Sequence, residues 1–325
     1  MTHPTVSVVM PVHNTARFVQ AAISSVLTQT FSDFELLIID DQGTDDAIDL
    51  CRQFVDPRIR IISQENRGLA GARNTGIRQA KGRYIALLDS DDLWLPEKLE
   101  RHVAHLDANS DVGVSYAASR LMADDGTPLS VAQRPKLTNI TSHNIFLRNP
   151  VGNGSAAVIR RKALGEIAHT SHRQGEMNYF DENFRQSEDI ECWTRIALLT
   201  GWEFEGIQGI WTLYRVNDEG LSANVIRQFD AWLRVKENVR TMSPSFAKRW
   251  EDAAEAYQLR YLARRAIRMG DKGLAINLAL RAVAKRPQIL LAEPVKTATT
   301  LAAAILLRYL PTRTYMTLQT RLMGA

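Results

Sequence analysis

The chain has 325 residues, of which 45% are apolar and 23% charged, so disordered, collagen-like and low-complexity proteins are excluded. Its two cysteines, Cys51 and Cys192, lie outside any C-x-x-C or Cys/His cluster, which excludes a thiolate zinc site and a disulfide scaffold. The net charge of +4 divides unevenly, with a balance of −7 over residues 1–224 and +11 over residues 225–325. We therefore expect a globular protein of a reducing compartment whose two parts meet different partners.

The first hundred residues alternate short apolar runs with amphipathic stretches, which is typical of a parallel β-sheet covered by helices. Helices are expected after each of the first four strands, at 17–27, after the turn at 42–45, at 68–80 and after Pro96. Residues 121–183 are less regular and contain a Gly/Asn-rich segment at 151–155, as expected of an acceptor-facing region. A further helix is predicted at 188–199 and a further strand at 211–216. The first five predicted strands are Val6–Val12, Phe34–Ile39, Ile59–Ser63, Tyr84–Leu88 and Val112–Ala118.

The second part has a wholly helical periodicity, with predicted helices at 229–240, 246–269, 272–284 and 292–310. We predict two domains, a sheet domain at 1–224 and a basic helical region at 225–325. A basic amphipathic region is typical of peripheral contact with an anionic membrane surface, and also of the solvated faces of a helical bundle. Nucleic acid is a weaker alternative, because no reader motif occurs and aromatic residues do not alternate with the basic ones.

No segment has the features of a membrane span or of a signal peptide. The best candidate for a span, residues 297–307, has 11 residues between Lys296 and Arg308, whereas a bilayer requires about 20. Residues 1–16 carry no Lys or Arg ahead of an apolar run. We therefore expect a cytoplasmic protein, with peripheral contact at the inner face of the plasma membrane as the membrane alternative.

Carboxylates follow the predicted strands at their C-terminal ends, where open α/β sheets bind ligands. Asp89, Asp91 and Asp92 occur within four residues just after the strand at 84–88. Three carboxylates so close together repel one another unless a cation neutralises them. Carboxylate oxygens are hard ligands, which suit Mg²⁺ or Mn²⁺ bound together with substrate phosphates. The alternative is a capping turn before the next helix, which needs only one of the three carboxylates.

Three further acidic residues and one arginine could carry chemistry. Asp41 ends the second strand, where it could accept hydrogen bonds from a base or ribose or simply form an Asx turn. Arg73, on the helix at 68–80, is a candidate for holding phosphate or nucleoside. Glu188 and Asp189 open a helix, where the dipole favours an ionised carboxylate that could act as a general base, although capping alone would also explain them.

Several other motifs are absent. The glycines at 68, 71 and 76 have the wrong spacing for a dinucleotide-binding loop and do not follow the first strand. Neither G-x-x-x-x-G-K-[ST] nor G-x-S-x-G occurs. These absences weigh against NAD, P-loop and serine-hydrolase chemistry.

Six sequence blocks together resemble the family 2 inverting glycosyltransferases of GT-A fold, over roughly residues 5–216. The blocks are VSVVMPVHN at 6–14, LTQTFSDF at 27–34, LLIIDD at 36–41, GLAGARNTG at 68–76, YIALLDSDD at 84–92 and the Glu188-Asp189 pair. The resemblance implies a Rossmann-like nucleotide-diphospho-sugar transferase domain followed by a helical extension. It also implies transfer of a sugar from a nucleotide donor, usually a UDP-hexose, with Mn²⁺ or Mg²⁺ on the diphosphate.

The resemblance further assigns roles residue by residue. It implies that Asp189 is the catalytic base with Glu188 beside it, and that Asp89, Asp91 and Asp92 form the metal-binding segment. It implies that the following residues contact the nucleotide-sugar: Pro11, Val12, Asn14, Asp41, Arg73, Asp89, Ser90, Asp91 and, through phosphate, Arg215.

Two positions depart from the family pattern. Many relatives carry His two residues after the arginine equivalent to Arg215, whereas this chain has Asn217. Gln42-Gly43-Thr44 replaces the commoner Gly-Ser-Thr. The first departure puts a histidine role near the diphosphate in doubt, and the second is a mild change in a turn.

The function expected from these features is transfer of a hexose to a hydroxyl of a saccharide or lipid-linked saccharide in surface polysaccharide synthesis. The pathway rests on the family resemblance and on no single residue. One alternative is a non-catalytic sugar-nucleotide-binding partner in a glycan-synthesis complex. A second alternative, a nucleotidyltransferase, would require a Gly/Arg/Lys-rich loop after the first strand, and the sequence lacks such a loop.

Overall fold

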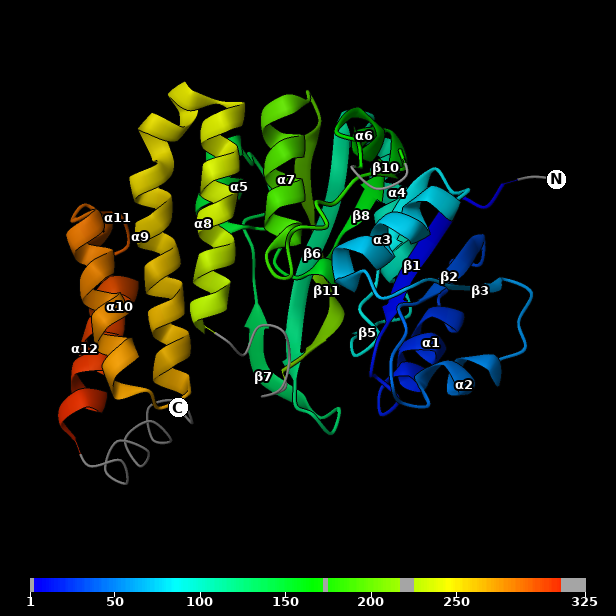
Figure 1. Cartoon of the computed structure of the whole chain (residues 1–325), viewed down its shortest axis with the longest axis horizontal. Helices are drawn as coiled ribbons and strands as arrows, with labels where there is room; N and C mark the ends of the chain where they lie inside the picture. Colours follow the sequence, from blue (N-terminus) through cyan, green and yellow to red (C-terminus); the bar gives the residue numbers. More distant parts are fainter. Residues whose placement is uncertain (1–2, 172–174, 217–224, 311–325) are drawn as a thin grey trace. The chain divides into compact units, whose positions relative to one another are not determined.

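The computed structural model describes residues 3–171, 175–216 and 225–310, and these form two compact units (Figure 1). The first unit comprises Met1–Ile145 and Asn149–Ala223, and the second comprises Phe146–Arg148 and Asn224–Ala325. The sequence-based boundary between residues 224 and 225 adjoins residues 217–224, which lie outside the described part. The exact division at that point therefore stays a prediction.

The main sheet of the first unit has the strand order β3-β2-β1-β4-β8-β6-β11-β5, with β7 paired to β6. A short antiparallel pair, β9 (His169–Thr170) with β10 (Met177–Asn178), stands apart from it. The main strands are β1 (Val6–Val12), β2 (Phe34–Asp40), β3 (Ile59–Ser63), β4 (Tyr84–Leu87), β5 (Leu93–Trp94), β6 (Val112–Met122), β7 (Pro128–Gln133), β8 (Val158–Arg160) and β11 (Glu203–Arg215).

The sheet is mixed, and its first four strands pair in parallel, as the sequence of the first hundred residues predicted. Strands β3, β2, β1 and β4 pair in parallel. Next to them β8 is antiparallel to both β4 and β6, so that β6 runs parallel to β4 without touching it. The last strand, β11, begins eight residues earlier than predicted and pairs in parallel with β6, with register irregularities near Ile207 and Ile210.

Helices cover both faces of this sheet because its strands are apolar on both sides. On one face, Val8 and Met10 of β1 pack with α1 (Val19–Leu27), α2 (Ala47–Arg52) and α4 (Lys98–Ala108). On the other face, Val9 packs with α3 (Gly68–Gln79), α6 (Arg161–Glu166) and α7 (Glu188–Leu199). The first unit is thus a three-layer α/β domain, as the sequence predicted.

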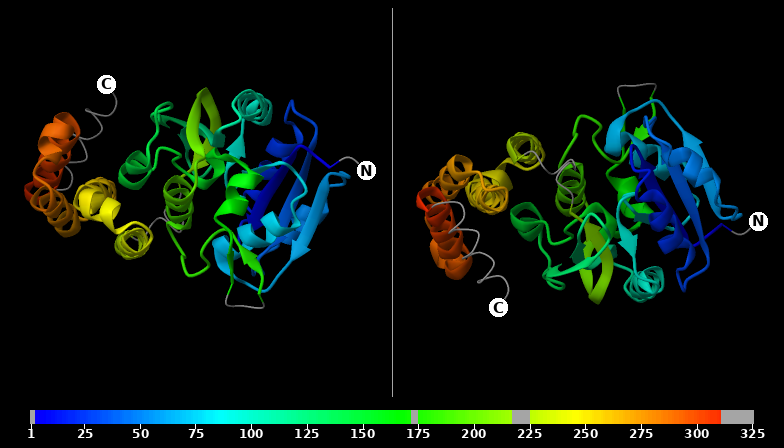
Figure 2. Two further views of the ribbon diagram at one scale, coloured as in Figure 1. Left: turned by 90° about the horizontal axis from the view of Figure 1, so that it is seen from above. Right: turned by 90° about the horizontal axis from the view of Figure 1, so that it is seen from below.

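The second unit is helical, also as predicted. Its helices are α8 (Val225–Met242), α9 (Pro244–Arg268), α10 (Lys272–Lys285), α11 (Ile289–Ala292) and α12 (Pro294–Tyr309). Figure 2 shows α9, α10 and α12 beside one another, and the last residues of α5 (Ser142–Arg148) join this unit. There Phe146 stacks on Trp232 with ring centroids 6.0 Å apart. Across the described ranges, no helix combines the length and apolarity that a membrane crossing requires.

Candidate active site

The acidic loops meet at one edge of the sheet. Asp41 follows β2 and Asp89 follows β4, and both strands pair in parallel with β1, so their C-terminal ends lie on the same side. The Thr15 hydroxyl lies 2.9 Å from the Ser90 hydroxyl and joins the loop after β1 to the acidic loop. The topology therefore gathers the predicted nucleotide-binding and acidic segments, as expected for ligand sites of open α/β sheets.

Asp41 is buried and orders the loop that precedes α3. Its Oδ1 accepts hydrogen bonds from Nε2 of Gln64 (2.6 Å) and from the backbone N–H of Arg67 (2.8 Å). Oε1 of Gln64 is buried and has no hydrogen-bond partner within the described ranges. The buried amide oxygen of Gln64 lies beside the anchored carboxylate of Asp41, and the base of a bound nucleotide could donate the hydrogen bond that this oxygen lacks.

Three non-glycine residues of these loops have left-handed backbone conformations. They are Asn14 (φ 54°), Gln42 (φ 50°) and Ser187 (φ 62°), which stand respectively after β1, after β2 and directly before α7. Such conformations cost about 1–2 kcal/mol for residues other than glycine. Asn14 is held by a 2.6 Å hydrogen bond from the backbone N–H of Thr44 to its Oδ1. The strain is concentrated at the edge that carries the acidic loops, as is common at functional sites.

Arg73 lies between the two acidic segments. Its side chain is 1% exposed, Nη2 donates to Oδ1 of Asp89 at 2.7 Å, and Nη1 donates to Oε1 of Glu188 at 2.7 Å. Burial alone would lower the pKa of Arg73, but attraction from Asp89, Glu188 and Asp189 outweighs it and raises that pKa. The guanidinium therefore bridges the loop after β4 to the start of α7. Its predicted contact with nucleotide stays a prediction.

Asp92 anchors the acidic loop to the protein interior. It is fully buried, and its two carboxylate oxygens accept hydrogen bonds from the Ser155 hydroxyl (2.6 Å) and the backbone N–H of Arg215 (2.8 Å). Burial, with repulsion from Asp91 and Asp89, raises its pKa well above the usual range. Arg215 itself is buried and donates to the carbonyls of Asp91, Ala123 and Asp124.

Asp91 is the member of the acidic trio most available to a ligand. It is partly exposed, and no side chain in the described ranges donates a hydrogen bond to its carboxylate. Burial, with repulsion from Asp89, raises its pKa to about 6. A cation at this position would offset that repulsion. No cluster of three or more His, Cys, Asp or Glu suited to a metal occurs within the described ranges.

A buried lysine supports the turn beneath the acidic loop. Nζ of Lys98 is fully buried and donates to the carbonyl of Ala156 (2.9 Å) and the hydroxyl of Thr212 (3.3 Å). Burial, partly offset by Asp92, lowers the pKa of Lys98 to about 7. The same turn presents the Ser155 hydroxyl, which accepts from the backbone N–H of Asp89 at 3.0 Å.

Glycine is required in this turn at position 154. A Cβ added there would lie 2.3 Å from Nη2 of Arg73 and 3.3 Å from Oδ2 of Asp89. The turn is the 3₁₀ helix Gly154–Ala156. Sequence reasoning predicted that residues 151–155 face the acceptor, and it found neither Lys98 nor the contact of Ser155 with the acidic loop. The Gly/Asn-rich composition of the segment was the available signal.

Asp189 lies in the first turn of α7 and is partly buried. Its Oδ1 accepts a 2.8 Å hydrogen bond from the backbone N–H of Ile190. Burial and repulsion from Glu188 raise the pKa of Asp189 to about 7, against the attraction of Arg73. An acid with a pKa near neutrality is suited to taking a proton from a hydroxyl group. Glu188, in contrast, is buried and held by Arg73.

The remaining predicted positions divide into three groups. Pro11 and Val12 are buried within β1 and pair with β2, Ser90 is buried against Thr15, and Asn14 ties the first two loops together. Asn217 lies outside the described residues. A binding or catalytic role for each predicted residue stays a prediction.

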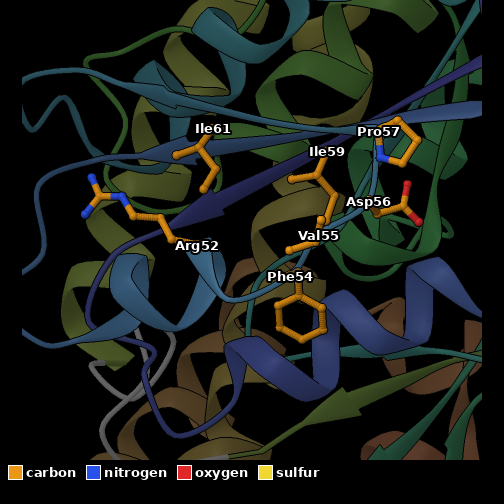
Figure 3. A pocket seen from close by; sticks show the side chains of 7 residues that line it. All are labelled: Arg52, Phe54, Val55, Asp56, Pro57, Ile59 and Ile61. Atoms are coloured by element: carbon orange, nitrogen blue, oxygen red, sulfur yellow. The ribbon is translucent and has the colours of Figure 1, made fainter.

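A hollow of about 520 Å³ lies elsewhere on the first unit, around the start of β3 (Figure 3). The start of a parallel strand lies at the sheet edge opposite the C-terminal ends that carry Asp41 and Asp89. Its lining is mainly apolar and brings no cluster of catalytic groups together. The lining residues are Arg52, Phe54, Val55, Asp56, Pro57, Ile59 and Ile61.

An open α/β sheet with acidic residues at its C-terminal edge is the architecture of nucleotide-binding α/β proteins. The model of the family described as "Glycosyl transferase family 2" matches residues 7–168. The chain is 30% identical over 224 residues to the UDP-Glc:alpha-D-GlcNAc-diphosphoundecaprenol beta-1,3-glucosyltransferase WfgD of Escherichia coli, covering 69% of this chain and 81% of WfgD. It is 31% identical over 226 residues to TuaG of Bacillus subtilis, named for glycosyl transfer in teichuronic acid biosynthesis, covering 68% and 82% of the two chains.

Solved structures agree on the fold. TarS 1-349 of S. aureus in complex with UDP has a TM-score of 0.58 at 16% identity, covering 99% of this chain and 92% of that one. The mannosyltransferase PcManGT of Pyrobaculum calidifontis, in complex with GDP-Man and Mn²⁺, has a TM-score of 0.59 at 20% identity, covering 95% and 88%.

The chain belongs to glycosyl transferase family 2 and is a glycosyltransferase. The predicted GT-A fold and the predicted enzyme class are both confirmed. This favours a catalyst over the non-catalytic binding partner that the sequence left open.

Proposed function

We propose that this enzyme transfers a hexose from a UDP-sugar to a hydroxyl of a lipid-linked saccharide, with inversion, in surface polysaccharide synthesis. The observation that carries the proposal is the placement of two carboxylate groups on the two sides of Arg73, whose guanidinium contacts both Asp89 and Glu188. Asp189 has a pKa raised to about 7, while the acidic trio follows β4 on the far side of the Arg73 bridge. The lipid-linked acceptor is supported by the name of WfgD, and UDP by both WfgD and TarS.

Asp189 is assigned the role of general base. In this scheme its carboxylate takes the proton of the acceptor hydroxyl while that oxygen forms a bond to the anomeric carbon. The bond between the anomeric carbon and the diphosphate breaks, and the nucleoside diphosphate leaves with the bonding electrons. Since attack and departure are in line, the anomeric configuration inverts.

Glu188 is assigned a positioning role. Its carboxylate is engaged with Nη1 of Arg73 and buried, so it is not free to accept a proton from substrate. Arg73 fixes it at the start of α7, next to the base. The left-handed conformation of Ser187 sets the direction in which the helix begins.

The acidic loop fits a divalent cation. Asp91 offers a partly exposed carboxylate, and Mg²⁺ or Mn²⁺ commonly takes one or two protein carboxylates with substrate phosphates completing its shell. Asp89 and Asp92 are engaged by Arg73, Ser155 and the backbone of Arg215, which favours Asp91 as the direct ligand. Such a cation would neutralise charge on the departing diphosphate.

The acceptor places the reaction at a membrane. A saccharide linked to a lipid is held at the bilayer surface, and the basic second unit supports peripheral contact at the inner face of the plasma membrane. A peripheral position would bring the enzyme to an acceptor held in the bilayer.

The test is an assay of sugar transfer from a panel of UDP- and GDP-sugars to a lipid-linked saccharide, in the presence of Mn²⁺, Mg²⁺ or EDTA. The release of nucleoside diphosphate measures the turnover. We expect turnover with one UDP-hexose, dependence on the cation, and a product of inverted configuration by NMR. Asp91→Asn should weaken cation-dependent donor binding, and Asp49→Asn, an exposed carboxylate of α2, is the matched control. Turnover with a GDP-sugar alone, or retention of configuration, would contradict the proposal.

A further inference from the structure

One face of α12 carries an apolar stripe that no other part of the described chain covers. Val295 is 72% exposed, Ile305 is 44% exposed and Tyr309 is 80% exposed. Ala298, Ala302 and Leu306 are exposed between them. At 100° per residue these six positions fall within an arc of about 100°, so they form one continuous stripe along a 16-residue helix.

The opposite side of α12 is the one that packs inside the second unit. Thr297, Thr300, Ala304 and Leu307 are its buried residues, and Figure 2 shows the helix beside α10. The stripe is therefore not the packing face of the helix. It is a second apolar surface on the same element, and contiguous exposed apolar patches mark interaction sites.

The charged side chains of α12 itself are all positive. Between Pro294 and Tyr309 the helix carries Lys296 and Arg308 and no carboxylate. Glu293, directly before it, is already engaged by Arg148 and Arg260. Residues 225–310 as a whole carry 16 Lys and Arg against 7 Asp and Glu.

We infer that the α12 stripe is the surface by which this enzyme docks on an anionic lipid bilayer. The helix lies in the plane of the interface, with the stripe among the acyl chains and the basic side chains among the headgroups. Tyr309, with an apolar ring and a polar hydroxyl, suits the boundary between them. The inference deepens the proposed function, because it rests on an acceptor held in a membrane.

Charge complementarity selects the bilayer over a second copy of the chain. Two copies that met through this stripe would bring two basic surfaces together, and like charges oppose such an approach. An anionic leaflet instead attracts each nearby Lys or Arg. A protein partner would have to supply a carboxylate-rich apolar groove.

The test is co-sedimentation of the full-length protein with vesicles of phosphatidylcholine alone or with 30% phosphatidylglycerol. We expect binding to the anionic vesicles that falls at least tenfold in Ile305→Glu and in Val295→Glu, and little binding to the neutral vesicles. Val55→Glu is the matched control, because Val55 is 99% exposed on the first unit and the charge change is the same. Circular dichroism verifies that each variant is folded.

Three results would overturn the inference. The first is that the wild-type protein does not bind anionic vesicles. The second is that the Ile305→Glu and Val55→Glu variants bind these vesicles equally well. The third is that analytical ultracentrifugation shows a wild-type dimer that Ile305→Glu dissociates. Donor turnover with a detergent-solubilised acceptor separates this inference from the proposed function. If the Ile305→Glu variant keeps that turnover and the wild-type protein does not bind vesicles, the inferred docking surface is wrong, whereas the assignment as a transferase is unaffected.

Discussion

Replacing Arg73 with methionine should destabilise the first unit strongly. The guanidinium is 1% exposed and makes two 2.7 Å contacts, with Asp89 and with Glu188. Methionine fills similar volume but leaves both carboxylates without their cation in a buried site. Breaking a buried ion pair from one side typically costs about 3–5 kcal/mol, because a buried charge stays uncompensated. For a unit of this size that corresponds to a loss of roughly 6–20 °C in Tm.

The assay is urea denaturation followed by circular dichroism, with the free energy of unfolding extrapolated to water. The control is Arg52→Met, which removes an exposed pair with Asp49 and should cost no more than about 1 kcal/mol. The double variant Arg73→Met/Glu188→Gln should recover part of the loss, since it removes one of the two uncompensated charges. An Arg73→Met variant within about 1 kcal/mol of wild type would refute the bridge.

Three further predictions concern the same site. Lys98→Met should weaken UDP binding about tenfold by calorimetry, because the turn that presents Ser155 loses its support; unchanged affinity would contradict this role. Gln42→Gly should raise the free energy of unfolding by about 0.5–1 kcal/mol, since glycine adopts the positive φ at no steric cost; a destabilised variant would argue against strain there. The pKa of Asp189 is raised from 3.8 to about 7, so its contribution to stability is present below about pH 4 and is lost as the pH rises through 7. In EDTA, Asp189→Asn should therefore show a smaller decline in stability between pH 4 and pH 8 than wild type, and an equal decline would contradict the raised pKa.

Much of the fold could be predicted because it follows from local patterns. The strands β1 and β3 and the helix α7 begin and end where the sequence placed them. Apolar periodicity determines such elements without reference to the rest of the chain. The three-residue strand β8 could not be found in this way, because its place between β4 and β6 depends on pairing with residues far away in the sequence.

The candidate site could be predicted where its residues have a clear position in the sequence pattern, but not where they depend on tertiary contacts. Asp41, Asp89 and Asp189 could be singled out because they stand at the ends of strands or at the start of a helix. Arg73 could be named, but its engagement with two carboxylates depends on tertiary packing that brings residues 115 positions apart together. Lys98 carries no sequence signal of its own, and only its buried hydrogen bond to Ala156 reveals its role.

The most direct test of the account is the turnover of Asp189→Asn, measured together with donor affinity. We predict a loss of kcat of about 10²–10⁴-fold, with the Kd for the nucleotide-sugar changed by less than about threefold, because asparagine keeps the shape of the side chain but cannot take the proton. We also predict that wild-type kcat/KM rises with pH through about 7 and that this rise is absent from the residual activity of the variant. A variant that keeps more than a tenth of wild-type kcat would contradict the assignment of Asp189 as the base.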